Sequence, residues 1–319
     1  MTDNRDYIGF FECFYYGTKT LTFCKDWMYF YHMKIYYKGA IYNESFPKIS
    51  IINRGIFYGE TVFTTVRVEK DFLLFFDDHL ERLKECVFYL LPETVRESFN
   101  WINFSQDISR GVDLLVRQKA FDAGKIRITC FLEGEDISTV PTKGRMEFFI
   151  LMEEIDFSYS KDVSLNLVGK KLNVVYGNTL TKIKSGNYFS AFRSKGEVIH
   201  QGFDDVIFLT YNSEVLESTT SNIFFKKGNT VFTPKVCEYV LEGITRKHLI
   251  DCLKINKIDV QEGIFNIEEL YQADCAWLTS SLKGIQTIFS IDSKIIGDNN
   301  SDEITPLIQL FKDYIERFV

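Results

Sequence analysis

Proline is scarce in this sequence, acidic residues outnumber basic ones, and histidine and cysteine follow no metal-binding pattern. The 5 prolines among 319 residues belong to an ordinary globular composition. The formal net charge of −7 argues against a nucleic-acid-binding protein, because neutralising phosphates requires a basic face. The four histidines form no HxxxH or HExxH motif, and the seven cysteines are scattered. We therefore predict no metal site and no disulfide framework, and we expect reduced thiols in a cytoplasmic protein.

Long apolar runs are also absent. Residues 7–32, YIGFFECFYYGTKTLTFCKDWMYFYH, are rich in aromatic side chains, but charged residues interrupt every apolar run. This segment is too broken for a signal peptide or a membrane span, so we expect no membrane association. At Met33 the pattern changes to MKIYYKGAIY, which is typical of a strand, a turn and a strand. We interpret residues 1–32 as an appendage that need not be ordered and Met33 as the start of the fold.

What is present indicates two α+β units. A chain of this length can form about two domains. The polar, aperiodic stretch 153–162 is a plausible connection between a small α/β domain at 33–152 and a larger domain at 163–319. In the first unit, alternating strand residues are broken at Arg54-Gly55, a helix over HLERLKECVFYLL follows Asp77 or Asp78 as its cap, and a second helix is expected over 106–123.

Two lysines stand two positions apart in TKIKSGNYFSAF, residues 181–192. A lysine becomes a nucleophile when burial or a nearby cation lowers its pKa, and it can then form a Schiff base with a carbonyl compound such as pyridoxal phosphate. Lys184 precedes a Ser-Gly-Asn-Tyr turn and is the candidate for this role. A solvated loop lysine is the more common case for any single lysine, and Lys182 keeps that interpretation.

Three further stretches favour a phosphate-bearing cofactor. EGITRKHL (242–249) places free backbone N–H groups at the start of a helix, where they bind phosphate. LTSSLKG (278–284) is a hydroxyl-rich turn after a buried strand. EVLESTTSNIF (214–224) puts Glu217 at a strand end, where a carboxylate could keep a pyridinium nitrogen protonated. Each stretch alone is equally compatible with an ordinary cap, turn or exposed strand end.

In this order, these motifs resemble the class IV aminotransferases, the branched-chain aminotransferase-like family of pyridoxal 5'-phosphate enzymes. NRGIFYGETVFTTVRV, HLERL, IKSGNYF, VLESTTSNIF, LEGITR and LTSSLKGI each look like a family motif, and together they span essentially 33–319. The resemblance implies the two-domain fold type IV, as in D-amino acid aminotransferase, with a β-barrel-like core in the larger domain. It also implies a homodimer that acts on a small amino acid and a 2-oxo acid.

Carried over by motif, the resemblance assigns the cofactor site. Asn187 stands three residues after Lys184 and so selects Lys184, not Lys182, as the Schiff-base lysine and proton carrier. Glu217 would pair with the pyridine nitrogen, and Tyr188 would touch the ring hydroxyl. The phosphate would be held by Arg82, Ile244, Thr245 and Ser281. Without the family, Arg82 would be interpreted as an exposed helix arginine paired with Glu85.

Three reactions share this scaffold, and the sequence leaves the choice open. D-amino acid transamination is disfavoured, because Phe63 and Glu133-Gly134 replace the tyrosine and arginine that those enzymes use. Tyr58, Arg67, Arg127 and Tyr188 are similar to branched-chain aminotransferases, and Arg127 is a candidate for the substrate carboxylate. Thr65, Leu282 and the K-x-x-N spacing of 184–187 are similar to aminodeoxychorismate lyase, which releases pyruvate and 4-aminobenzoate. A non-catalytic relative is a third possibility, against which Lys184, Glu217 and Arg82 speak together.

Overall fold

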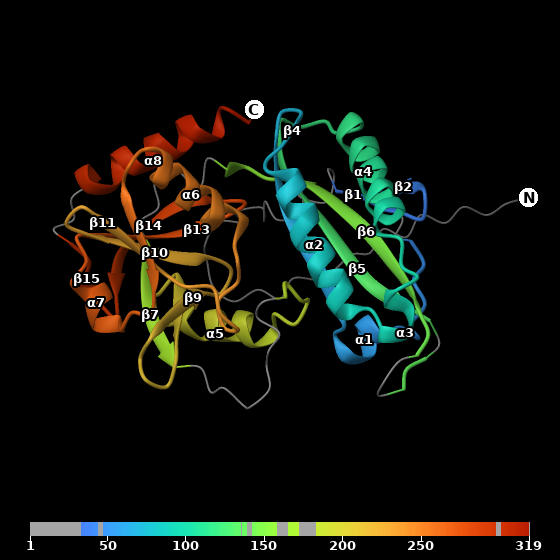
Figure 1. Cartoon of the computed structure of the whole chain (residues 1–319), viewed down its shortest axis with the longest axis horizontal. Coiled ribbons are helices and arrows are strands. Elements are labelled where there is room, and N and C mark those ends of the chain that lie inside the picture. The colour runs from blue at the N-terminus through green and yellow to red at the C-terminus, as the bar shows by residue number, and fades with distance from the viewer. Residues whose placement is uncertain are drawn as a thin grey trace, which may run out of the picture. The chain divides into compact units, whose positions relative to one another are not determined.

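The computed structural model describes residues 33–43, 47–134, 136–138, 142–157, 165–171, 183–297 and 301–318. These residues form two sheets, each covered by helices (Figure 1). The predicted appendage 1–32, Lys182 and the second half of the predicted connection at 153–162 lie outside the described residues. The domain boundaries therefore stay a prediction.

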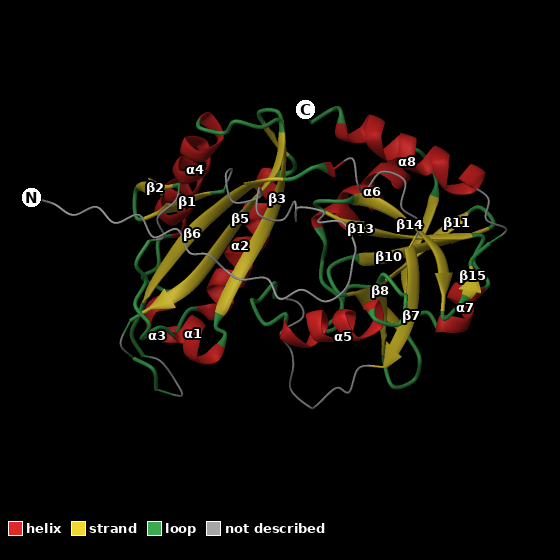
Figure 2. Ribbon diagram, turned by 180° about the vertical axis from the view of Figure 1, so that it is seen from behind, coloured by secondary structure: helices red, strands yellow, loops and turns green. Residues whose placement is uncertain are grey.

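The first sheet has six strands in the order β2-β1-β6-β5-β3-β4, and every neighbouring pair is antiparallel. Two long helices, α2 and α4, lie on one face of it, and Figure 2 shows the strands from the opposite side. The elements of this part are β1 (Lys34–Tyr37), β2 (Ala40–Tyr42), α1 (Arg54–Tyr58), β3 (Thr61–Glu69), β4 (Phe72–Leu73), α2 (Phe76–Leu90), α3 (Glu93–Arg96), α4 (Trp101–Arg117), β5 (Ala123–Glu133) and β6 (Arg145–Glu154).

The second sheet has nine strands and mixes parallel with antiparallel pairs. Its main path is β12-β11-β10-β13-β14-β7-β8-β9, and β15 pairs with β14. The elements are β7 (Leu165–Lys171), α5 (Phe189–Ile199), β8 (Asp205–Leu209), β9 (Val215–Ser218), β10 (Asn222–Lys227), β11 (Thr230–Pro234), α6 (Ile244–Ile255), β12 (Asp259–Gly263), α7 (Ile267–Tyr271), β13 (Cys275–Ser280), β14 (Gly284–Ile291), β15 (Lys294–Ile295) and α8 (Ser301–Ile315).

Three local predictions are corrected. The chain at Arg54-Gly55 does not simply interrupt a strand but forms helix α1, because Asn53 caps it and Gly59 ends it in the left-handed conformation, φ 68°. Helix α4 begins at Trp101 and not near 106, because the Asn100 side chain accepts a hydrogen bond from the Asn103 backbone. Its predicted end at 123 is also wrong, since Ala123 already belongs to β5.

Helix α2 carries a site residue, and its start also differs from the prediction. Neither Asp77 nor Asp78 is the cap; both lie in the first turn, and Phe75 is the capping residue in the left-handed conformation, φ 55°. Along the helix, Leu83, Cys86 and Val87 are buried at the spacing of one helical face. Burying a side chain such as Leu83 contributes about 2 kcal/mol. This packing against the first sheet fixes the direction in which the other side chains of α2 point.

The second sheet is covered by α6 and α8 through a shared core that includes Leu249, Phe224, Trp277 and Phe311. This core holds the first turn of α6 beside the ends of strands β10 and β13. Among the described residues, no helix is long and apolar enough to cross a membrane.

Candidate active site

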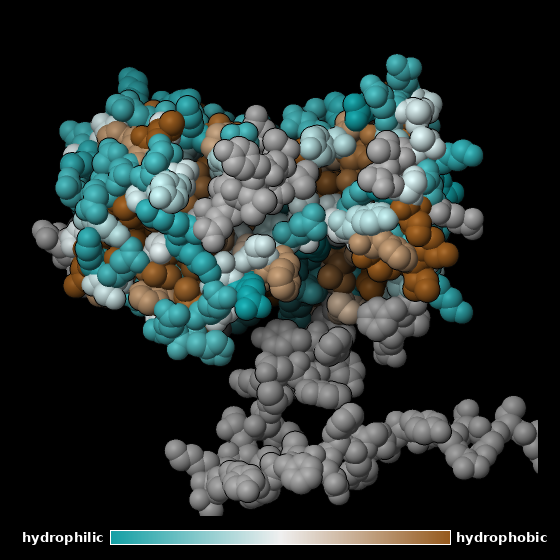
Figure 3. Space-filling model, turned by 90° about the horizontal axis from the view of Figure 1, so that it is seen from below, coloured by the Kyte–Doolittle hydropathy of each residue, from teal (hydrophilic) through white to brown (hydrophobic). Residues whose placement is uncertain are grey.

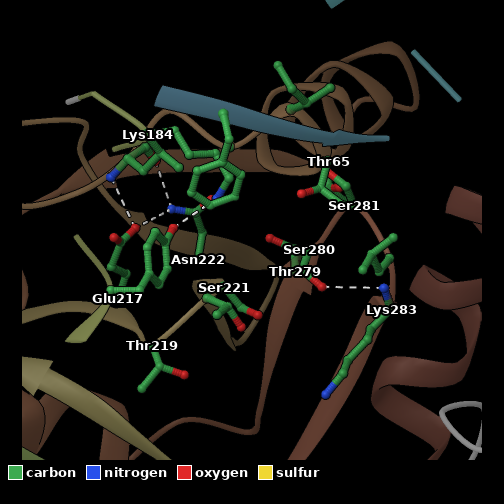
Figure 4. Close-up of a pocket in the computed structure, with 18 of the residues that line it drawn as sticks. Thr65, Lys184, Glu217, Thr219, Ser221, Asn222, Thr279, Ser280, Ser281 and Lys283 are labelled. Atoms are coloured by element: carbon green, nitrogen blue, oxygen red, sulfur yellow. Dashed lines mark hydrogen bonds between the residues drawn. The ribbon is translucent and has the colours of Figure 1, made fainter. Parts of the chain in front are cut away.

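A cavity of about 310 Å³ is lined by both sheets. Strands β3 and β5 of the first sheet contribute to its wall, and so do β9, the start of α6 and the turn between β13 and β14 (Figure 4). All of the predicted site residues except Tyr58 and Arg67 line it. They are Thr65, Arg82, Arg127, Lys184, Tyr188, Glu217, Ile244, Thr245, Ser281 and Leu282.

Lys184 is anchored to the first sheet by its backbone. Its carbonyl accepts a hydrogen bond of 2.9 Å from the Phe63 N–H, and Gly186 donates one of 2.8 Å to the Thr61 carbonyl. A Cβ at position 186 would meet the Thr61 hydroxyl at 2.0 Å, so this close approach requires glycine. The side chain enters the cavity, where Nζ donates a 2.9 Å hydrogen bond to the Tyr188 hydroxyl. Burial and the nearby Arg82 lower the pKa of Lys184 to about 7.

Glu217, in β9, is oriented by two hydrogen bonds to one of its carboxylate oxygens. Oε2 accepts 3.0 Å bonds from the Asn222 side-chain amide and from the Leu241 backbone N–H. Neither of these bonds involves Oε1. Burial raises the pKa of Glu217 to about 8, although the bond from Leu241 opposes this shift. Figure 4 shows Glu217, Asn222 and Lys184 converging on the same part of the cavity.

Arg82 and the start of α6 bring several hydrogen-bond donors together at one end of the cavity, and we call this group the anion seat. The guanidinium of Arg82 donates 3.1 Å hydrogen bonds to the Glu242 carbonyl and to the Thr64 hydroxyl. Its Nε is buried and has no hydrogen-bond partner among the described residues. Helix α6 begins after Gly243 without a side-chain cap, so the N–H groups of its first turn are free for a ligand. Both features suit a phosphate group.

The turn between β13 and β14 completes this end of the cavity. Thr279, Ser280 and Ser281 line it, and the Thr279 hydroxyl is buried without a hydrogen-bond partner in the described part of the chain. From outside the cavity, Arg67 donates a 2.9 Å hydrogen bond to the Leu282 carbonyl. Arg67 thus supports the turn and does not line the cavity.

The remaining predicted substrate residues divide between cavity and surface. Arg127 lies in the cavity wall with its guanidinium carbon 3.5 Å from the centre of the Phe63 ring. Burial lowers the pKa of Arg127. Thr65 lies on the same wall. Tyr58 lies on α1 outside the cavity, is 49% exposed, and donates a 2.6 Å hydrogen bond to the Ile137 carbonyl.

Several cavity residues were missed from the sequence. Lys125 lies two positions before Arg127 on the same strand, so the period of two along a strand places both on one face and could have identified it. Asn222 belongs to the STTSNIF stretch, but the sequence carries no signal that its amide turns back to Glu217. The other lining residues outside the predicted set are Phe63, Gly186, Phe192, Thr219, Thr220, Ser221, Leu241, Thr279, Ser280 and Lys283.

The family model for amino-transferase class IV matches residues 61–291. The chain belongs to this family. The resemblance inferred from the sequence motifs and the α+β fold class, fold type IV, are thereby confirmed. Proteins similar to this chain are named both as branched-chain-amino-acid aminotransferases and as aminodeoxychorismate lyases.

Two curated relatives of this chain carry different names. The chain is 28% identical to a putative branched-chain-amino-acid aminotransferase of Methanocaldococcus jannaschii, over 88% of this chain and 96% of the relative. It is 25% identical to aminodeoxychorismate lyase of Bacillus subtilis, over 89% and 96%.

Solved structures share the fold. The branched-chain aminotransferase from Thermoproteus uzoniensis with norvaline matches with a TM-score of 0.78 at 21% identity, covering 90% of this chain and 96% of that one. Another branched-chain amino acid aminotransferase, complexed with N-(5'-phosphopyridoxyl)-L-glutamate, matches with a TM-score of 0.75 at 21% identity, covering 90% and 94%.

Proposed function

We propose that this class IV aminotransferase binds pyridoxal 5'-phosphate and transfers an amino group between an amino acid and a 2-oxo acid. The amino acid would be a branched-chain-like L-amino acid or glutamate. The observation that carries the proposal is that Lys184 Nζ lies in one cavity with the oriented carboxylate of Glu217 and the anion seat at Arg82. A structural lysine needs neither of these neighbours.

The residues of the cavity fit this cofactor. The unpaired Arg82 Nε, the unpaired Thr279 hydroxyl and the uncapped start of α6 are the donors that a phosphate needs. Ile244, Thr245 and Ser281 would contribute to the same seat. Oε1 of Glu217 is left for a pyridine nitrogen, and Lys184 would hold the aldehyde carbon. The solved complex of a related branched-chain amino acid aminotransferase with a phosphopyridoxyl compound supports the same cofactor.

When bound, pyridoxal phosphate supplies an electron sink for the α-carbon of an amino acid. Lys184 is placed to take a proton from that carbon and to return it, because its lowered pKa keeps Nζ neutral above about pH 7. Tyr188 fixes the position of Nζ through their 2.9 Å hydrogen bond. Glu217 Oε1 would hold a proton on the ring nitrogen, and Arg127 would bind the substrate carboxylate.

A second candidate function is aminodeoxychorismate lyase. The position of Thr65 and Leu282 on the cavity wall favours it, because both are lyase-like residues of the sequence. The similarity to the Bacillus subtilis lyase supports it as well. A catalytically degenerate binding protein is the third candidate, and the common location of Lys184, Glu217 and Arg82 speaks against it.

We also propose a homodimer, as the family resemblance implies, and a cytoplasmic location, as the scattered cysteines indicate. Figure 3 shows hydrophobic side chains on both sides of the molecule, and one group of them lies on the side that carries the first sheet. Helix α1 belongs to this part, and its Ile56, Phe57 and Tyr58 are exposed by 63%, 53% and 49%. Covering these side chains with a second copy would remove apolar surface from water. The role predicted for Tyr58 is compatible with such an interface.

Product analysis distinguishes the two activities. The protein, loaded with pyridoxal phosphate, is incubated with leucine, valine or glutamate plus a 2-oxo acid, and separately with aminodeoxychorismate. We expect transfer of the amino group in the first set of reactions. Release of 4-aminobenzoate without any amino-group transfer would overturn the preferred function and establish the second candidate.

A further inference from the structure

Helices α2 and α6, which carry the two halves of the anion seat, meet a second time one helical turn away. Asp78 lies four residues before Arg82 on α2. Lys247 and His248 lie three residues after Ile244 and Thr245 on α6. The carboxylate of Asp78 accepts a hydrogen bond of 2.9 Å from His248 Nε2 and another from Lys247 Nζ. We call Asp78, Lys247 and His248 the helix clamp.

His248 is the rigid member of the clamp. It is 6% exposed, and its ring stacks on Phe75 with centroids 3.5 Å apart and an interplanar angle of 9°. Because a carboxylate can only accept, Nε2 donates to Asp78, and Nδ1 is left to pair with the Tyr314 hydroxyl at 3.1 Å. Phe75 is the capping residue of α2. The stack and the hydrogen bond therefore hold the same end of α2 against α6.

Lys247 restrains Asp78 less than His248 does. Its side chain is 48% exposed, against 8% for His248 in the same clamp. Ion pairs of exposed lysines are screened by solvent and hold their partners weakly. The bond between Asp78 and His248 is directional and its histidine end is buried, so it sets how the two helices lie along one another.

The clamp lies one helical turn from the anion seat on both α2 and α6, so the position of the clamp can affect the position of the anion-binding donors. Arg82 donates to the Glu242 carbonyl at 3.1 Å, just before α6 begins. A phosphate would have to reach Arg82 and the first N–H groups of α6 together. A shift of α2 along α6 would separate these donors without moving Glu217 or Lys184, which lie on other segments.

We propose that Asp78 and His248 are positioning residues that hold Arg82 in register with the amino end of α6, and so set the affinity of the seat for the phosphate of the cofactor. This inference rests on the proposed function. The clamp should strengthen binding of the phosphate group and leave binding of the pyridine ring unchanged.

The test compares pyridoxal phosphate with pyridoxal, which lacks the phosphate. Equilibrium binding of each is measured on the wild type and on Asp78→Asn, with Asp77→Asn as the matched control because Asp77 is an exposed neighbour in the same turn. We expect Asp78→Asn to weaken pyridoxal phosphate binding roughly tenfold, the scale on which outer-shell partners act at metal sites. Binding of pyridoxal should stay unchanged, and Asp77→Asn should bind both compounds as the wild type does.

A second variant covers the case in which Asp78→Asn fails to fold. His248→Phe keeps a ring against Phe75 but removes both hydrogen bonds, whereas His248→Gln retains an N–H donor. The phenylalanine variant should lose affinity for pyridoxal phosphate alone, and the glutamine variant should recover part of it. Equal weakening of both compounds, or no weakening at all, overturns the clamp while the wild type still binds the cofactor. A wild type that binds neither compound overturns the proposed function and the clamp with it.

Discussion

The side-chain amine of Lys184 and the hydroxyl of Tyr188 are 2.9 Å apart across a single turn of the chain. Burial raises the pKa of Tyr188 to about 12 and lowers that of Lys184 to about 7. Between these values the phenol is protonated and the amine is neutral. A neutral amine held at a fixed point by a phenol is what a lysine nucleophile requires.

The reactivity of Lys184 should depend on pH in a way that an ordinary lysine does not. Only the neutral amine attacks an aldehyde, and the pKa is lowered from 10.5 to about 7. The rate at which cofactor-free protein captures pyridoxal phosphate should therefore rise about tenfold per pH unit below pH 7 and level off above it. Stopped-flow absorbance measures this rate. A rise that continues steadily to about pH 9 would show that Lys184 titrates as an ordinary lysine.

Replacing Glu217 by glutamine should separate binding from chemistry. Glu217→Gln keeps the shape of the side chain but removes the titratable carboxyl group that would hold a proton on the ring nitrogen. We expect the cofactor to remain bound and turnover to fall on the order of 10²-fold, the usual effect of removing one electrostatic partner. Glu214→Gln is the control, because Glu214 lies three residues before Glu217 and its carboxylate accepts a hydrogen bond from the Thr210 hydroxyl. Unchanged turnover in Glu217→Gln would remove this residue from the chemistry.

Substitution of Gly243 should disturb both the Glu217 carboxylate and the anion seat, because Gly243 packs closely against Asn222. Its φ of −71° suits any residue, but a Cβ would meet the Asn222 side-chain oxygen at 2.0 Å. Gly243→Ala should therefore displace Asn222 from Glu217 and lower cofactor affinity and turnover together. Gly196→Ala, on α5 with nothing within 4 Å of the added carbon, should leave both unchanged. Equal behaviour of the two variants, measured by titration with pyridoxal phosphate, would contradict the packing described here.

Thr64 supports Arg82 from the core. Its fully buried hydroxyl accepts a bond from Arg82 and lies 2.7 Å from His79 Nδ1. Thr64→Val keeps the shape but leaves two buried polar groups without their partner. The free energy of unfolding should fall by about 1 to 3 kcal/mol, as urea denaturation would show. Thr94→Val, at an exposed helix position, should change it by less than about 0.5 kcal/mol; an equally small effect at Thr64 would contradict this role.

Most of the residues predicted from the sequence line one cavity, and each of them belongs to a short local motif. The family motif places an asparagine three positions after its lysine, which made Lys184 the candidate, and Ile244 and Thr245 begin a helix after a glycine. Helix α2, with its clear apolar periodicity, was also predictable apart from its first residues.

What could not be predicted depends on contacts between distant segments. The bond from Asn222 to Glu217 and the bond from Arg67 to Leu282 follow from how strands lie in the folded sheets. The start of α2 was misplaced because Phe75, its capping residue, adopts a left-handed conformation. The ring of Phe75 stacks on His248 of helix α6, which covers the second sheet. Pattern along the chain carries no signal for such a contact.

The most direct test of the central claim is the absorbance of the protein after incubation with pyridoxal phosphate. A lysine joined to this cofactor absorbs visible light, and we expect such a band in the wild type and in Lys182→Ala, but not in Lys184→Ala. This result would identify Lys184 as the residue that holds the cofactor. A wild type without a band, or a band that persists unchanged in Lys184→Ala, would contradict the account.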